Sequence, residues 1–320
     1  MVTEKLRVKR AGAWARDNTN LILLLVMIVA GALMSENFLT YSNLMNLLRR
    51  VTVNGIMAIG FTMTLLVGGF DLSIGSTMSL CAVLCVGFEN NYGSAGLAMA
   101  VAMGAGCGMG LINGLLMKLT RGGSGEAFLI TLATSMIGGS LATTYCNGSE
   151  LYGVHASWYK ALGQANIAGF PLSAIIWISL LVLFQVIIKK TQFGRRLLLS
   201  GANKKSAYLA GVNVGAMKVI AFTLAGAMAA VAAVIMSSRT TGASPNSGAG
   251  GDFDAAIASI IGGNALVGGH GGMAQVFIGT ITYGLITNIL NLLGVASVVQ
   301  YIVKGGILLL AICLDNLKKR

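Results

Sequence analysis

The chain has 320 residues, of which 55% are hydrophobic and only 10% are charged. Soluble globular domains carry about 25% charged residues, so this composition excludes a water-soluble fold. The formal net charge of +12 does not indicate a nucleic-acid-binding protein, because basic residues collect in the cytoplasmic loops of membrane proteins.

Apolar segments follow one another along almost the whole chain. Their approximate limits are 20–34, 51–67, 74–88, 97–119, 127–146, 172–188, 217–237, 255–267, 273–293 and 297–314. A full membrane span needs roughly 20 residues, so the shorter segments are expected to be tilted, partial or extended by their flanks. The sequence predicts an all-α polytopic membrane protein of about ten transmembrane or partial helices, in one transmembrane domain over residues 1–320.

The distribution of basic residues predicts the orientation. Residues 1–19 form a basic N-terminal tail with no evident cleavage site. If the tail is cytoplasmic and the ten segments alternate, 17 of the 22 basic residues lie inside: Lys5, Arg7, Lys9, Arg10, Arg16, Lys118, Arg121, Lys189, Lys190, Arg195, Arg196, Lys204, Lys205, Lys218, Lys318, Lys319 and Arg320. Arg49, Arg50, Lys160 and Arg239 lie outside, and Lys304 lies within the last segment. This excess predicts that both termini are cytoplasmic.

Three connections are longer than plain turns. Residues 35–50 have apolar positions at near-helical spacing, which predicts a short amphipathic helix on the outer face. Residues 147–171 form a polar outer loop in which Trp158 and Tyr159 are expected to be interfacial anchors. Residues 189–216 form the largest basic cytoplasmic loop.

No catalytic or metal site is predicted. The glycine-rich run at residues 262–272 lacks the Lys-Ser/Thr pair of a phosphate-binding loop. The glycines between positions 104 and 114 lie inside an apolar segment, so they predict close helix packing. The five cysteines form no CxxC pair. The chain is therefore not expected to be an enzyme, and energy for transport would come from a partner or an ion gradient.

Residues 68–76 (GGFDLSIGS) place a carboxylate, Asp71, between two apolar segments. A charge at that depth costs several kcal/mol unless it is paired or interfacial. The sequence allows two roles for Asp71 and Ser73. Either Asp71 and Ser73 cap the helix that follows, or they form a hinge or polar gate beside a substrate path.

A second glycine-rich element covers residues 242–272. Asp252 and Asp254 precede a helix start, the favourable end of its dipole. Helices broken at membrane depth are tolerated where they line a cavity or are buried in protein. This element is therefore expected to face a translocation path or a subunit interface.

Uncharged polar residues inside the segments are candidates for contact with a neutral, hydroxyl-rich ligand. They are Asn54, Thr62, Asn113, Asn288, Asn291 and Gln300. The alternative for each is a hydrogen bond between helices. Lys304, four residues after Gln300, is expected to snorkel or to form an ion pair.

Taken together, several motifs resemble the permease subunits of ribose/galactose-type (CUT2) ABC importers over nearly the whole chain. They are residues 38–48 (FLTYSNLMNLL), 68–76, 194–214 (GRRLLLSGANKKSAYLAGVNV), 242–272 and 292–311 (LLGVASVVQYIVKGGILLLA). The chain departs from the usual pattern at Phe70, Asp252, Asn264, Ala265, Lys204 and Lys205.

The resemblance implies the ABC importer permease fold in a bacterial inner membrane, with a second permease copy as homo- or heterodimer. It implies a cytoplasmic ABC ATPase, of tandem-domain type, that holds the ATP and Mg, with no cofactor in this chain. It also implies a periplasmic binding protein that delivers a monosaccharide such as ribose. The coupling loop, at 189–216, would meet the ATPase through Gly194, Arg195, Arg196, Gly201, Asn203, Tyr208 and Gly211.

Arg49, Arg50 and Arg239 lie on the side that should be poor in basic residues. We expect them to receive acidic residues of the binding protein, since the guanidinium fork suits carboxylates. The alternatives are pairing with Glu36, Asp252 or Asp254, or contact of Arg49 and Arg50 with lipid headgroups.

Other functions remain open at this point. A permease of the same fold could import a nucleoside or a signalling sugar. An ion-coupled secondary transporter would keep ionisable residues at mid-membrane, and only Asp71 and Lys304 qualify. A non-transporting scaffold would not need glycine-broken helices.

Overall fold

The computed structural model describes residues 19–318, with side chains described as far as residue 309. The helices are α2 (Thr19–Met34), α3 (Tyr41–Leu66), α4 (Ile74–Tyr92), α5 (Ala95–Leu119), α6 (Ser124–Tyr145), α7 (Ser157–Gln164), α8 (Leu172–Lys190), α9 (Gln192–Ala202), α10 (Lys204–Leu209), α11 (Val214–Thr240), α12 (Gly251–Ile261), α13 (Met273–Leu292) and α14 (Ser297–Lys318). Strands β1 (Leu151–Tyr152) and β4 (Gly242–Ala243) pair antiparallel, as do β2 (Asn166–Ile167) and β3 (Phe170–Pro171).

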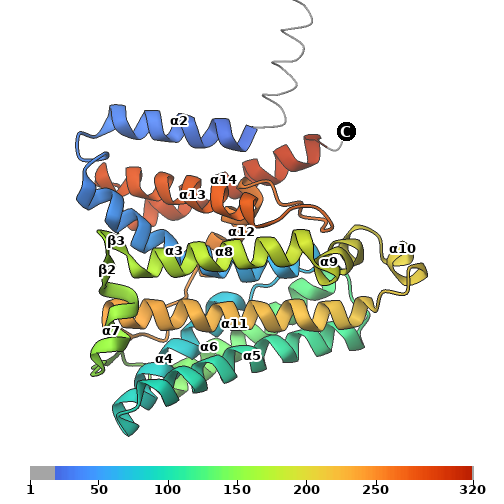
Figure 1. Cartoon of the computed structure of the whole chain (residues 1–320), viewed down its shortest axis with the longest axis horizontal. Coiled ribbons are helices and arrows are strands. Elements are labelled where there is room, and N and C mark those ends of the chain that lie inside the picture. Colours follow the sequence, from blue (N-terminus) through green and yellow to red (C-terminus); the bar gives the residue numbers. More distant parts are fainter. Residues whose placement is uncertain (1–18, 319–320) are drawn as a thin grey trace, which may run out of the picture.

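Nine of the ten predicted apolar segments lie on helices over almost their whole length, and segment 255–267 is helical only as far as Ile261. This confirms the all-α polytopic class. Within the described residues, α5, α6, α8, α11 and α13 are long and apolar enough to cross a membrane, and α2 and the start of α14 are shorter apolar helices. These helices lie side by side between two ends of the molecule (Figure 1). At one end lie α9 and α10, and at the other lie α7, β2 and β3.

Helix α11 lies at the centre and packs against α5, α3 and α4. Glycines let α5 and α11 approach closely, since a Cβ added at Gly106 would lie 2.4 Å from the carbonyl oxygen of Gly226. The glycine run at 104–114 is therefore explained in part by helix packing, as predicted.

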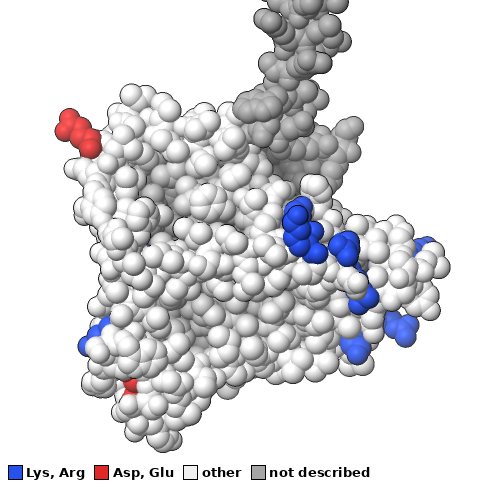
Figure 2. Space-filling view, viewed as in Figure 1, with Lys and Arg blue, Asp and Glu red and all other residues white. Residues whose placement is uncertain are grey.

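Charged side chains are concentrated at the ends. Figure 2 shows Lys and Arg side chains gathered over α9 and α10, whereas the broad face between the two ends shows almost no charge, as a lipid-facing surface requires. The start of α2 and the end of α14 point to the α9–α10 end (Figure 1). This arrangement agrees with the expected shared side of the termini, and the assignment of that side to the cytoplasm remains a prediction.

Two outer connections differ from expectation. Residues 41–50 are not a separate amphipathic helix but the first turns of α3, because Leu47 and Val51 are buried against the rest of the molecule. Residues 147–171 form an ordered cap rather than a loop. Tyr159 is buried there, and its hydroxyl lies 2.6 Å from that of Ser237, so it is not an interfacial anchor, whereas Trp158 is exposed.

Both predicted helix breaks are present, and they contact each other. Helix α3 ends at Leu66 and α4 begins at Ile74, whereas α12 extends for only 11 residues. The N–H of Gly248, just before α12, donates to Ser79 Oγ of α4 at 2.9 Å. The chain before α12 therefore enters the interior and packs on α4, which brings the start of α12 inside the molecule.

Candidate functional site

Three neighbouring cavities lead from the end that carries α7 toward the start of α12. The first, of about 510 Å³, is lined by Asn46, Arg49, Arg50, Gly163, Gln164 and Arg239. The second, of about 150 Å³, is lined by Arg50, Val53, Asn54, Met57, Met78, Met236, Arg239, Asp254 and residues 247–249 and 251. The third, of about 40 Å³, lies between α3 and α13 and is lined by Leu47, Arg50, Val51, Asn54, Thr280, Tyr283, Gly284, Thr287, Asn288 and Asn291. Arg50 lines all three.

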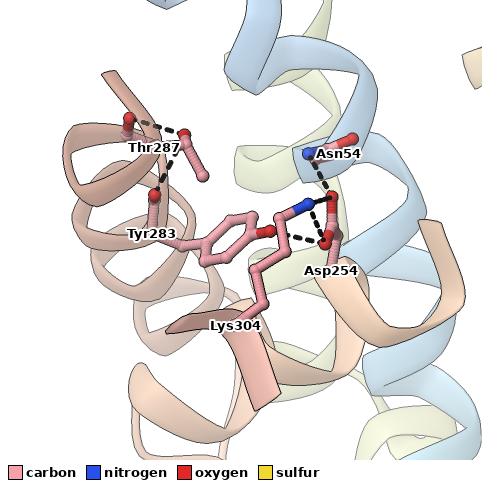
Figure 3. A network of polar contacts seen from close by, with 6 residues as sticks. Asn54, Asp254, Tyr283, Thr287 and Lys304 are labelled. Carbon is pink, nitrogen blue, oxygen red and sulfur yellow. Dashed lines mark hydrogen bonds and ion pairs between the residues drawn. The ribbon is translucent and has the colours of Figure 1, made fainter. Parts of the chain in front are cut away.

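A polar network at the start of α12 borders the two inner cavities (Figure 3). Lys304 Nζ of α14 lies 2.9 Å from Asp254 Oδ1 and 3.1 Å from Oδ2. The Tyr283 hydroxyl donates to Asp254 Oδ1, and Asn54 Nδ2 lies 3.4 Å from Oδ2. The expected pairing of Lys304 is confirmed, and its partner lies in the first turn of α12, where the helix dipole also favours a carboxylate.

The predicted ligand-contact residues separate into groups. Asn54, Asn288 and Asn291 line the same cavity. Asn288 exchanges two hydrogen bonds with Asn43 of α3, at 3.0 and 2.8 Å. Two others serve helix contacts: the Thr62 hydroxyl lies 2.8 Å from Ser259 Oγ of α12, and Gln300 Nε2 donates to Asn291 Oδ1 at 3.0 Å.

Asp71, Ser73 and Asn113 form a separate buried cluster that borders none of these three cavities. Asp71 Oδ1 accepts from the N–H and the hydroxyl of Ser73, at 2.8 and 2.6 Å. Asn113 Nδ2 donates to Ser73 Oγ at 2.8 Å. The capping interpretation is wrong in its details, since Ser73 is the N-cap residue of α4 but makes no side-chain cap bond.

The three outer arginines surround the first cavity, as a cluster. Arg49 donates to Asn166 Oδ1 at 2.8 Å, and Arg239 donates to the carbonyl oxygen of Arg49 at 3.0 Å. None of the carboxylates with described side chains forms an ion pair with them, and Asp254 pairs with Lys304. The alternative of pairing with Glu36, Asp252 or Asp254 is therefore wrong.

Comparison with known proteins decides the family. The family model described as "Branched-chain amino acid transport system / permease component" matches residues 43–312. The ribose import permease protein RbsC of Bacillus subtilis is 35% identical over 99% of this chain and 97% of its own length. The Escherichia coli K12 protein of the same name is 34% identical over 96% of each chain, and the L-arabinose transport system permease protein AraH is 33% identical over 94% of this chain and 90% of its own.

The chain belongs to the permease family of ribose/galactose-type ABC importers. No solved structure matches it significantly. The relatives are transport subunits and not enzymes. Permeases of this family are multi-pass proteins of the inner membrane, in agreement with the apolar helices of this chain.

Residues 189–216, predicted as a loop that meets the ATPase, are mostly helical, since they contain α9 and α10. Gly194 and Gly201 are packed, since a Cβ at Gly201 would lie 2.0 Å from the carbonyl oxygen of Leu66. Asn203 caps α10 by accepting from the Ser206 N–H at 3.1 Å. The exposed residues of this segment include Arg195, Arg196, Asn203, Lys204, Lys205, Tyr208, Leu209 and Gly211.

Sequence reasoning missed most of the polar residues on α13. Thr280, Tyr283, Thr287 and Asn291 line the small cavity, and their spacing of three and four residues is that of one helix face. The same spacing rule singled out only Asn288 and Asn291. Applied to hydroxyl side chains as well as to amides, it would have found this face.

Proposed function

We propose that the chain forms the translocation path for a monosaccharide of the ribose class. The series of cavities from the arginine cluster to the start of α12 carries this proposal. Apart from Arg50 and Arg239, the two inner cavities are lined by amides, hydroxyls and apolar side chains, and the carboxylate of Asp254, which borders the larger of the two, is neutralised by Lys304. Such a lining suits an uncharged, hydroxyl-rich solute.

Permeases of this family work with an ATPase and with a binding protein. We propose that here the partners are a cytoplasmic, tandem-domain ATPase, which holds ATP and Mg, and a periplasmic sugar-binding protein. A second permease copy would complete the path, because 150 Å³ is well below the roughly 300 Å³ at which small-molecule pockets begin. Bilayer lipid surrounds the pair, and neither a cofactor of this chain nor nucleic acid takes part.

Exposed coupling residues support the proposed ATPase contact. Leu209 is 85% exposed and lies beside the exposed Tyr208 at the charged end of the molecule. An apolar pair at such a position suits insertion into a groove of a partner protein. The packed Gly194 and Gly201 would then pass movement to the membrane helices, with Arg195, Arg196, Asn203 and Gly211 at the contact.

The decisive experiment is reconstitution in liposomes. The purified chain alone is expected to show no ATP hydrolysis and no uphill uptake, whereas the complex with its ATPase and binding protein should accumulate D-ribose when ATP is supplied. Sugar accumulation by the chain alone, driven by a proton or sodium gradient, would instead identify a secondary transporter. ATP-driven uptake of a nucleoside, a signalling sugar or leucine in place of D-ribose would overturn the proposed substrate.

A further inference from the structure

The small cavity between α3 and α13 contains a hydroxyl that has no partner. Thr280 is 1% exposed, and its Oγ1 forms no hydrogen bond with any described residue. Leaving a buried donor unsatisfied costs about 1–3 kcal/mol. Thr280 lines the cavity, so the free hydroxyl lies within the wall of a space that a ligand group can enter.

Other threonines of α13 behave differently. Thr282 donates to the carbonyl oxygen of Ile278 at 2.8 Å, and Thr287 donates to that of Gly284 at 2.9 Å. These bonds are the usual way in which a hydroxyl inside a helix is satisfied. Thr280 therefore differs from two neighbours of the same type on the same helix.

Asn54 faces the same cavity from α3. Its Nδ2 makes one long bond to Asp254, at 3.4 Å, and its carbonyl oxygen accepts no hydrogen bond from the described residues. An amide offers two donors and one acceptor oxygen. The cavity therefore has unused hydrogen-bonding capacity on both walls.

The size of the cavity limits what can enter. About 40 Å³ is more than a water molecule needs but far too little for a whole sugar. The adjoining cavity of about 150 Å³ shares Arg50 and Asn54 with it. One hydroxyl-bearing carbon can therefore enter the small cavity while the rest of the ligand lies in the larger one.

We propose that Thr280 and Asn54 form a subsite that binds one hydroxyl group of a monosaccharide during its passage. The inference rests on the proposed function and names residues that select for the sugar. Neutral groups suit this role because they exchange hydrogen bonds with a hydroxyl without the desolvation penalty of a charge.

The test combines permease variants with deoxy sugars in the complete transporter. Thr280→Val removes the hydroxyl and nearly conserves the volume, and Thr282→Val is the matched control on the same helix. Initial uptake of D-ribose and of its monodeoxy analogues is measured for wild type and each variant. Recognition of each analogue by the binding protein is the same for all permease variants, so it cancels in the comparison.

One of the monodeoxy analogues lacks the hydroxyl that the subsite binds. Wild-type uptake of that analogue should be roughly two- to tenfold lower than that of D-ribose, the range expected for one hydrogen bond. Thr280→Val should lower D-ribose uptake by a similar factor, with no further loss when the two changes are combined. Thr280→Ser should restore uptake. Thermal stability of Thr280→Val should not fall, because the lost hydroxyl had no partner.

Purely structural roles predict a different pattern. For Thr282→Val, the loss of uptake caused by the variant and the loss caused by the deoxy sugar should add. If the two losses also add for Thr280→Val with every deoxy sugar, or if Thr280→Val does not change uptake, the inference is wrong while the proposed function stands. If the wild-type complex takes up no monosaccharide, both fail. If Thr280→Val does not assemble, Thr280→Ala carries the same comparison.

Discussion

Two aspartates, Asp71 and Asp254, lie just before or at the start of helices that begin inside the molecule, and they differ in what surrounds them. Asp71 is 2% exposed, and its Oδ1 serves only Ser73, two residues along the chain. Asp254 is bound by groups from three other helices and borders a cavity. One carboxylate closes a turn, and the other joins helices around a space.

The sequence around the two aspartates looks alike, since both follow glycine-rich breaks. The difference arises from cations and cavities, which depend on tertiary structure. Lys304 lies 50 residues after Asp254, and no described cation pairs with Asp71. A carboxylate that serves its own turn stabilises the fold, whereas a paired carboxylate beside a cavity can also act on a solute.

The largest expected effect is that of Asp254→Asn, which should be much more damaging than Asp71→Asn. Asp254→Asn leaves the Lys304 ammonium without its partner in a site where the two side chains are only 22% and 14% exposed. Breaking such a pair should cost roughly 2–4 kcal/mol, and uptake should be largely lost. Asp71→Asn keeps an acceptor oxygen for Ser73 and should cost roughly 1 kcal/mol or less. Thermal unfolding measures the loss of stability of each variant, and ATP-driven uptake in liposomes measures its loss of transport.

A double variant provides the control for the ion pair. Asp254→Asn combined with Lys304→Met removes both charges, so much of the lost stability should return. The contrast between the sites fails if Asp71→Asn is the more damaging single change. It also fails if the double variant is as unstable as Asp254→Asn alone.

A smaller effect is expected at Gly201, where the segment proposed to contact the ATPase packs against the ends of both broken helices. A Cβ at Gly201 would lie 2.0 Å from the carbonyl oxygen of Leu66 and 2.7 Å from the N–H nitrogen of Gly269. Leu66 ends α3 before the Asp71 turn, and Gly269 lies in the loop after α12. Gly201→Ala should therefore disturb both, cost roughly 1–3 kcal/mol, and lower uptake more than ATP hydrolysis.

Gly211 is the matched glycine in the same segment. Its φ of +73° is strained for other residues, but no atom lies within 4 Å of an added Cβ. Gly211→Ala should cost roughly 1–2 kcal/mol of local backbone strain and lower the ratio of uptake to hydrolysis less than Gly201→Ala does, because it does not press on Leu66 or Gly269. Equal uncoupling by both variants would show that flexibility of the segment matters and not its packing on Leu66.

The helices and their breaks could be predicted because they depend on local sequence. Apolar runs located the long helices, though not α7, α9 and α10, and glycines located the breaks before α4 and α12. Partners of buried polar groups could not be predicted, because they come from distant segments: Asn43 and Asn288 are 245 residues apart. Tyr159 was misplaced for the same reason, since its partner Ser237 lies on α11.

The smallest expected effect concerns the rim of the path, above Asp254. Arg50 is exposed and lines all three cavities, and it has no described carboxylate partner. If the arginine cluster receives acidic residues of the binding protein, Arg50→Glu should weaken docking roughly two- to tenfold at low salt, mainly through slower association. Binding kinetics at two salt concentrations measure this.

Lys160→Glu is the control, because Lys160 lies on α7 at the same end but lines none of these cavities. It should change docking less than Arg50→Glu, and basal ATP hydrolysis should persist in both. Charge at the rim acts before the sugar enters, whereas Asp254 borders the path itself. Arg49 lines only the first of the three cavities, so saturating binding protein should restore uptake for Arg49→Glu but not for Asp254→Asn. If reversal of Arg49, Arg50 and Arg239, one at a time, changes neither docking nor its salt dependence, the arginines serve the fold and the binding protein docks elsewhere.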